Sequence, residues 1–298
     1  MRKIAAILCV LVGAAGAEGD ADHSNKAKPA KAKLPVSKVL KVQVNKGDRV
    51  KGQNSVSYEV ETSETNGQRV NKRMESVQRT EKFVDVIKES GQLGVVRERS
   101  YLTRYEKVRT DGGRPEVLQD PLTGRTVLIR ESKRRRVVSA IDGSRISPLV
   151  RRTVGMEIDW RDVLSKDPVK PGDEWEGDAT ALARRVAAHF DCGSRSKMRV
   201  RYEGDVEHEG ARCAHLYIDW RIEGMRDRNL FTKVMLAGDA YLDLDNGRFI
   251  DIDLTGRLVV RGAILGKGFP TIIKGQGPVT LKSTLKAAPI QASAPSGE

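Results

Sequence analysis

The sequence predicts a mainly β protein with minor helix, an α+β fold built on a large antiparallel sheet. The sheet is expected to form a sandwich or an open half-barrel from two weakly similar halves. Apolar and polar residues alternate with period two in many runs bounded by Gly, Asp and Asn, which is typical of antiparallel strands with one solvated face. The stretch VNKGDRV (Val44–Val50) nearly recurs as VKPGDEW (Val169–Trp175), and this favours an internal duplication.

The N-terminus has the pattern of a secretory signal peptide. Arg2 and Lys3 precede the apolar run Ile4–Val12, and Ala15-Gly16-Ala17 matches an A-x-A cleavage site. Residues 1–17 are therefore expected to be removed on export, which places the mature chain in the periplasm or outside the cell.

The remaining chain divides by composition. Cys9 lies inside the apolar run of the signal peptide, so lipid modification is not expected there. Residues 18–34, rich in Ala, Lys and Pro, are expected to be a flexible tether, and residues 287–298 a disordered tail. Between them we expect an N-terminal β-rich half at 35–150 and a C-terminal β-rich half at 151–286, with no transmembrane helix after processing.

In the N-terminal half, strands are expected at Ser55–Thr62 and on both sides of two turns. The first turn is Ser90-Gly91-Gln92, between 82–89 and 93–106, and the second is Ser132-Lys133. Period-two runs on both sides of a short polar turn indicate hairpins.

In the C-terminal half, residues 197–210 and 211–224 are expected to form a hairpin that turns at Glu209-Gly210, and 279–285 a last strand. A helix is predicted over 178–190, because Asp178 can cap its N-terminus and three apolar residues follow at intervals of four. A short helix is expected at 160–164.

The hairpin Ala240–Leu254 shows how burial is expected to set a register. A three-residue loop, Asp245-Asn246-Gly247 with Gly247 in the left-handed conformation, brings the aliphatic side chains to one face, whereas a two-residue turn mixes them with aspartates. The three-residue loop is therefore predicted. It places Ala240, Leu242, Leu244, Ile250, Ile252 and Leu254 inward, and Tyr241, Asp243, Phe249, Asp251 and Asp253 outward.

The two Gly-Asp pairs are interpreted as equivalent turns, in which Gly supplies positive φ and Asp bonds the nearby backbone. After Gly47-Asp48 come a hairpin centred near Gly91 and a strand opening near Gly124. After Gly172-Asp173 come a hairpin near Gly210 and a strand opening near Gly238.

With PVKPGDEWE and the downstream LAGDAYLDLDNGRFIDIDLTGRL, the chain resembles a group of uncharacterised exported bacterial β-rich proteins, a domain of unknown function. These carry a signal peptide and a V-K-x-G-D-x-W element between two similar halves. The resemblance implies the fold and export, and it assigns no functional residue.

Cys192 and Cys213 are the cysteines that remain after processing. In an oxidising compartment two cysteines usually pair, so a disulfide is predicted. Two free buried thiols are one alternative. A zinc site is the other, drawn from His189, Cys192, His208, Cys213 and His215.

The charge balance favours anionic partners. Removal of the signal peptide takes away Arg2 and Lys3 and no acid, so the net charge of +13 becomes +11. The densest basic run is a candidate docking patch, or an edge-strand charge that resists sheet-to-sheet pairing: Lys133, Arg134, Arg135 and Arg136. Nucleic acid is disfavoured, because no helix is rich in Arg and Lys.

Signals for catalysis are thin. The sequence has no G-x-S-x-G, H-E-x-x-H, phosphate loop or G-x-G-x-x-G, and no cofactor is expected. We expect a non-enzymatic exported β protein that binds a lipid-like or anionic envelope component. The alternatives are a hydrolase with a carboxylate pair at Asp159 and Asp162, and a purely structural envelope module.

Overall fold

A computed structural model describes residues 37–66, 68–91, 94–132, 136–154, 160–179, 195–226, 229–264 and 270–288. Long strands account for most of them. The strands are β1 (Arg49–Asn66), β2 (Arg69–Gly91), β3 (Gly94–Thr110), β4 (Glu116–Gln119), β5 (Thr126–Glu131), β6 (Arg136–Ala140), β7 (Glu174–Gly177), β8 (Arg195–His208), β9 (Ala211–Arg226), β10 (Leu230–Asp243), β11 (Arg248–Ile264) and β12 (Thr271–Ala287).

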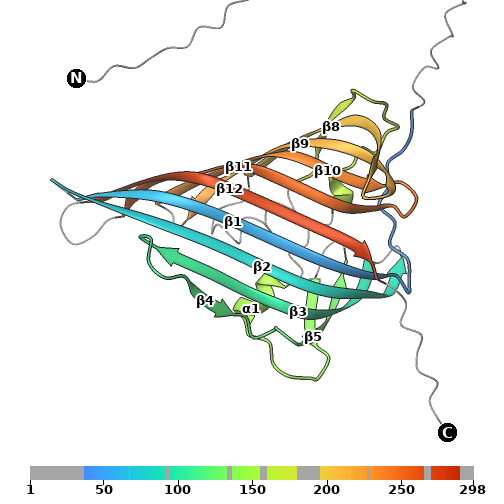
Figure 1. The fold of residues 1–298 in the computed structure, drawn as a ribbon, viewed down its shortest axis with the longest axis horizontal. Coiled ribbons are helices and arrows are strands. Elements are labelled where there is room, and N and C mark those ends of the chain that lie inside the picture. The colour runs from blue at the N-terminus through green and yellow to red at the C-terminus, as the bar shows by residue number, and fades with distance from the viewer. Residues whose placement is uncertain are drawn as a thin grey trace, which may run out of the picture. The chain divides into compact units, whose positions relative to one another are not determined.

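All of these strands belong to one antiparallel sheet of 12 strands, ordered β6-β5-β3-β2-β1-β12-β11-β10-β9-β8-β7, with β4 paired to β3. The predicted large antiparallel sheet is confirmed, in its open form. The chain enters at the centre with β1, runs outward to β6, crosses to β7 at the opposite edge, and returns to the centre at β12 (Figure 1). The two expected halves are therefore joined in one sheet by the pairing of β1 with β12.

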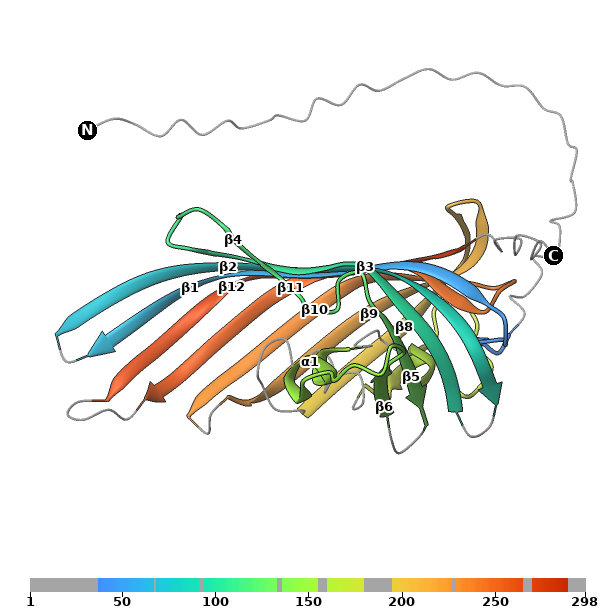
Figure 2. The same ribbon diagram turned by 90° about the horizontal axis from the view of Figure 1, so that it is seen from below.

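The sheet is arched, and the segment between β6 and β7 lies under its concave face (Figure 2). This segment contains α1 (Pro148–Thr153) and the 3-10 helix η1 (Trp160–Val163), which confirms the short helix expected near Trp160. We did not expect α1, although Ser147 before Pro148 is a recognisable start, since the Ser147 hydroxyl accepts the Val150 N–H at 3.3 Å. Of the helix predicted over 178–190, residues 180–190 lie outside the described part of the chain, and Asp178 and Ala179 are not helical.

The concave face carries two apolar clusters. The larger one lies on the strands from β8 to β12 and on β1, and Trp160 and Val163 of η1 pack against it. The smaller one lies on β2, β3, β5 and β6, and includes Phe83 and Tyr101. Because successive strand residues point to opposite faces, the polar partners of these runs lie on the convex face. Within the described residues, no helix is long and apolar enough to span a bilayer.

The first Gly-Asp turn leads into β1. Gly47 has φ of 90°, and the Asp48 carboxylate accepts the Asn45 N–H at 3.0 Å. The turn is fixed to β2 by two backbone bonds, from Gly47 N–H to Ile87 O at 2.8 Å and from Ile87 N–H to Asp48 O at 2.9 Å.

The second Gly-Asp turn leads into β7 with the same bonds. Gly172 has φ of 92°, and Asp173 accepts the Lys170 N–H at 3.0 Å. Gly172 N–H donates to Tyr202 O at 2.7 Å, and Tyr202 N–H donates to Asp173 O at 3.0 Å. The first strand of each half thus begins with the same turn, bonded in the same way to the following long strand.

The later match between the halves is looser. Gly124 lies in the turn before β5, whereas Gly238 lies inside β10, eight residues after its start at Leu230. The duplication of the whole halves stays a prediction, for which the two turns are local support.

The β10–β11 hairpin corrects the predicted register. Asp243 pairs with Arg248 around a four-residue turn, Leu244–Gly247, and the register shifts by a bulge next to Tyr241. Ala240, Leu242, Ile252 and Leu254 are buried as predicted, and Gly247 is left-handed with φ of 59°. The outward placement of Asp243 and Phe249 was wrong, since both are buried. On the turn side of the bulge, the β11 residues point to the opposite face of the sheet from the one predicted. Phe249 therefore points inward and packs on Trp160, with ring centroids 5.8 Å apart.

Gly247→Val is expected to destabilise the protein more than Asn246→Ala. The new Cβ would lie 2.6 Å from Gln43 Cγ and would carry a β-branched side chain at positive φ, a strain of about 1–3 kcal/mol. Asn246→Ala removes the hydrogen bond from its Nδ2 to Asp243 Oδ2 (2.7 Å), which contributes about 1 kcal/mol. Urea midpoints of the two variants provide the comparison, and equal losses would contradict it.

Candidate binding cavity on the concave face

A cavity of about 120 Å³ lies on the concave side, where β1 begins and β2 and β12 end. Its apolar wall comes from Phe83, Trp160, Phe249 and Leu285 together with aliphatic side chains. Its polar groups are Asp48, Asp85, Arg97, Arg99 and Arg248. The site therefore combines aromatic surface with clustered arginines.

The segment before β1 forms one side of the cavity. Val42, Gln43 and Val44 line it, and the Gln43 N–H donates to Gly247 O at 2.6 Å. A further bridge pairs Lys38 with Val169. Residues 38–48 are thus held across the sheet by backbone hydrogen bonds at both ends.

Arg97 and Arg99 reach the cavity because they are two residues apart on β3 and share a face. Arg99 is 0% exposed, and Asp85 on β2 accepts its Nε at 2.6 Å and its Nη2 at 2.5 Å. Its guanidinium lies 3.5 Å from the centre of the Phe83 ring. Burial lowers the pKa of Arg99, but the charge and hydrogen bonds of Asp85, together with Tyr101 and Glu81, outweigh it and the pKa is raised.

Three further ion pairs border the cavity. Arg97 lies 3.7 Å from Asp85 and 3.3 Å from Glu131. Arg248 at the start of β11 lies 3.1 Å from Asp48, the aspartate of the first Gly-Asp turn. The cavity lining therefore carries three arginines and two aspartates, and with Glu131 beside Arg97 each arginine has a carboxylate partner.

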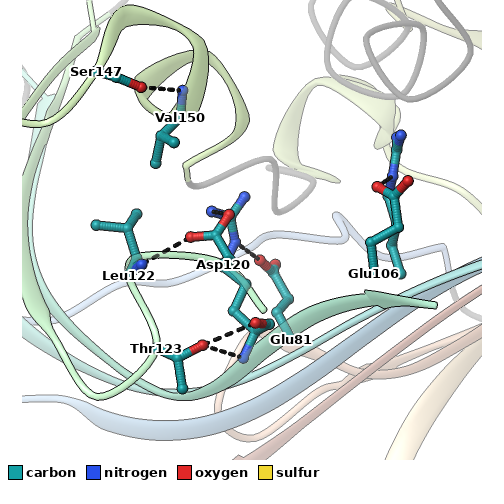
Figure 3. A network of polar contacts seen from close by, with 9 residues as sticks. Glu81, Glu106, Asp120, Leu122, Thr123, Ser147 and Val150 are labelled. Carbon is teal, nitrogen blue, oxygen red and sulfur yellow. Dashed lines mark hydrogen bonds and ion pairs between the residues drawn. The ribbon is translucent and has the colours of Figure 1, made fainter. Parts of the chain in front are cut away.

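A second polar network lies farther along β2 and β3 (Figure 3). Arg104 contacts Glu81 at 3.3 Å and Asp120 at 2.6 Å. Asp120 also accepts the Leu122 N–H at 2.9 Å, and the Thr123 hydroxyl donates to Arg104 O at 2.8 Å. These contacts attach the turn before β5 to β3, which is a structural role.

Several residues predicted as sites lie outside the described part of the chain: Lys133, Arg134, Arg135, Asp159, His189 and Cys192. Arg136 begins β6, an edge strand of the sheet, as the edge interpretation requires. Asp162 lies in η1, where only the backbone is described. The carboxylate pair, the basic patch and the Cys192–Cys213 disulfide stay predictions.

Cys213 is fully buried, and within the described residues it forms no disulfide. Burial raises its pKa, and the nearby carboxylate of Asp243 raises it further. A buried thiol with a raised pKa is a poor nucleophile.

The two described histidines of the proposed zinc set, His208 and His215, do not form a metal-binding group. Tyr241 is stacked on His208 at 3.7 Å and on His215 at 4.9 Å. Each imidazole bonds a different carboxylate, His208 to Asp251 at 3.2 Å and His215 to Asp239 at 2.7 Å. No group of three or more His, Cys, Asp or Glu side chains in the described part of the chain could hold a metal ion.

Sequence reasoning missed every polar residue of the cavity. Asp85, Arg97 and Arg99 lie in runs recognised as strands, but they are ordinary charged residues in a chain with 31% charged residues. One available signal was their spacing, since Arg97 and Arg99 fall on the same face as buried Tyr101. Charged residues on the inward face of a strand are uncommon and need partners.

No protein-family model matches the sequence, and no curated protein matches it. Among solved structures, lipovitellin, from a study of its lipid–protein interactions, is similar with a TM-score of 0.45 and 12% identity. The match covers 85% of this chain and 27% of lipovitellin, so the chain spans about a quarter of that protein.

Two bacterial structures are more distant. A domain assigned to outer membrane lipoprotein sorting in Vibrio parahaemolyticus matches 82% of this chain and 87% of its own, with a TM-score of 0.18 and 11% identity. A DUF1329 family protein from Desulfovibrio piger matches 81% and 87%, with a TM-score of 0.11 and 10% identity. Because these TM-scores lie below 0.5, what such proteins bind does not transfer to this chain.

Proposed function

We propose that the chain is an exported, non-enzymatic protein that binds one end of an anionic, lipid-like molecule in the concave cavity. The observation that carries the proposal is the lining itself, in which Arg97, Arg99 and Arg248 face an aromatic and aliphatic wall. Guanidinium groups bind carboxylates and phosphates through paired hydrogen bonds, so an acidic headgroup would add to the carboxylate contacts that these arginines already make. The adjoining wall would take the first part of a hydrocarbon chain.

The size of the cavity limits what enters it. Its volume is about 120 Å³, and an engineered apolar cavity of about 150 Å³ binds benzene. A few methylene groups fit and a whole acyl chain does not, so we expect one end of the ligand to be held. The signal peptide expected at 1–17 supports a compartment in which envelope lipids are available.

A brominated fatty acid tests this proposal, because bromine quenches indole fluorescence on contact. Both Trp160 and Trp220 are buried in the larger apolar cluster, with ring centroids 6.3 Å apart, but Trp160 lines the cavity and Trp220 does not. Dibromostearate is expected to quench part of the tryptophan emission in a saturable way. Unbrominated stearate should compete, and stearyl alcohol, which lacks the acid, should compete about tenfold less well, the value of one hydrogen bond to a charged group.

The matched control is Trp160→Phe, which keeps an aromatic wall and removes the reporter. The quenchable part of the emission should disappear while Trp175 and Trp220 remain. Quenching that persists in Trp160→Phe would place the ligand elsewhere, and a lack of saturable quenching in the unaltered protein would overturn the proposal.

A further inference from the structure

The convex face carries a concentrated positive charge at the end of the sheet away from the cavity. We call this surface the distal convex face. Its cations lie on β8, β9, β11 and β12. They point outward because their neighbours in the strand point inward: Lys197 precedes buried Met198, and Arg221 follows buried Trp220. The exposed cations are Arg195, Lys197, Arg221, Arg257, Arg261 and Lys274.

Few carboxylates offset this charge. Glu61 and Glu223 share the face, but Lys72 lies 3.4 Å from Glu61 and Lys233 lies 3.2 Å from Glu223. Arg195 is the direct cross-strand partner of Glu223, and the exposed Asp219 lies two residues from Arg221 on the same face of β9. The surface therefore carries six exposed cations against few carboxylates, and none of the six forms an ion pair with a described carboxylate.

The register places like charges directly opposite each other. Arg261 on β11 is the cross-strand partner of Lys274 on β12, and Arg221 on β9 is the partner of Lys197 on β8. Like charges in directly opposed positions destabilise a sheet. Because two such pairs lie on this surface, an external partner with many negative charges would relieve their repulsion.

Apolar side chains are exposed beside the cations. Val70 and Ile272 both pair with Thr65 and are 57% and 45% exposed. Met225, 49% exposed, is the partner of Phe231. A polyanion such as nucleic acid would use the charges alone, whereas a bilayer also takes exposed apolar side chains into its interfacial region.

The other end of the convex face carries charges of both signs. Asp239 and Asp253 are direct cross-strand partners there, and Asp251 lies on the same side of β11 two residues from Asp253. Lys282 lies 2.6 Å from Asp253, and the exposed Lys51 and Lys286 are cross-strand partners at this end. This end therefore mixes both signs and lacks the concentration of cations found on the distal convex face.

We propose that the distal convex face docks on a membrane that carries anionic headgroups. The cations contact the headgroups, and Val70, Met225 and Ile272 enter the interface between headgroups and acyl chains. This inference goes beyond the cavity and does not depend on what the cavity binds, because the two sites lie at opposite ends of the strands and on opposite faces of the sheet.

Co-sedimentation with vesicles tests the proposal. The protein without residues 1–17 is expected to bind vesicles that contain about one third phosphatidylglycerol, and not vesicles of phosphatidylcholine alone, with binding lost in high salt. The double variant Arg221→Glu/Arg261→Glu should lower the partition coefficient at least about tenfold, because each position changes from attraction to repulsion.

This double variant separates docking from folding. It converts both like-charge pairs into opposite-charge pairs, so it is expected to be at least as stable to urea as the unaltered protein. The matched control is Lys51→Glu/Lys82→Glu, which changes the net charge equally at exposed positions near the other end of the convex face. It should leave binding within about twofold, because those positions are more than a Debye length from the contact.

Val70→Ser/Ile272→Ser should weaken vesicle binding and leave retention on heparin unchanged. Equal binding to both vesicle types would overturn the proposal, as would a control variant that loses as much binding as Arg221→Glu/Arg261→Glu. Retention on heparin without vesicle binding would show that the distal convex face binds a polyanion, and it would overturn the proposal of a membrane partner.

Discussion

Asp85→Ala is expected to lower the free energy of unfolding by about 3–5 kcal/mol, the usual effect of removing one partner of a buried ion pair. Arg99 is 0% exposed and cannot reach solvent to replace the lost carboxylate. Asp85 also lies 3.7 Å from Arg97, so the change leaves two guanidinium groups close together in a low-dielectric site. Urea unfolding followed by tryptophan fluorescence measures the loss.

Two further variants test whether the unpaired buried charge causes the loss of stability in Asp85→Ala. Asp245→Ala breaks an ion pair with Arg212 whose side chains are 66% and 67% exposed, and it should cost no more than about 1 kcal/mol. Asp85→Leu/Arg99→Met removes the charged pair together and should recover much of the stability. The explanation fails if Asp85→Ala lowers the free energy of unfolding no more than Asp245→Ala does.

Gly277→Ala is expected to destabilise the junction of the two halves by about 3 kcal/mol or more, at the upper end of the cost of overpacking. A Cβ at Gly277 would lie 1.6 Å from the Glu59 carbonyl oxygen and 2.7 Å from its carbon. The obstacle is backbone on the adjoining strand, so no rotamer change relieves it, and β1 and β12 would have to separate.

The close approach has a local cause. Pairing of β1 with β12 is interrupted between Tyr58–Val279 and Glu61–Gln276, next to Pro278, which has no N–H to donate. Gly91→Ala is the control, because a Cβ there has nothing within 4 Å, and its stability should stay near that of the unaltered protein. A Gly277→Ala variant with an unchanged urea midpoint would contradict the close packing of these strands.

The proposed membrane contact on the distal convex face and the cavity lie on opposite faces of the sheet. The concave face holds the apolar clusters and the small mixed cavity, whereas the convex face presents six exposed cations at its distal end. Because strand alternation separates the two faces, substitutions on the convex face can change docking without altering the cavity. The dibromostearate and vesicle experiments can therefore be interpreted independently.

The sequence by itself determined the class of fold and most of the strands. Period-two alternation depends only on neighbouring residues, so it located the strands around Gly91, Glu209-Gly210 and Gly247 before any tertiary information. The same local chemistry predicted that the two Gly-Asp pairs form turns, and the structure gives them the same hydrogen bonds. Cleavage after Ala17 and the Cys192–Cys213 disulfide remain predictions from the sequence.

Only the tertiary structure decided which strands meet, because pairing between distant strands depends on contacts that no local pattern records. The pairing of β1 with β12, about 220 residues apart in the chain, joins the halves into one sheet, and the register of β2 with β3 places Asp85 beside Arg99. One bulge turned Phe249 inward against the alternation. The net charge of +13 indicated anionic partners, but the pairing of β8, β9, β11 and β12 gathered six of the cations on one surface.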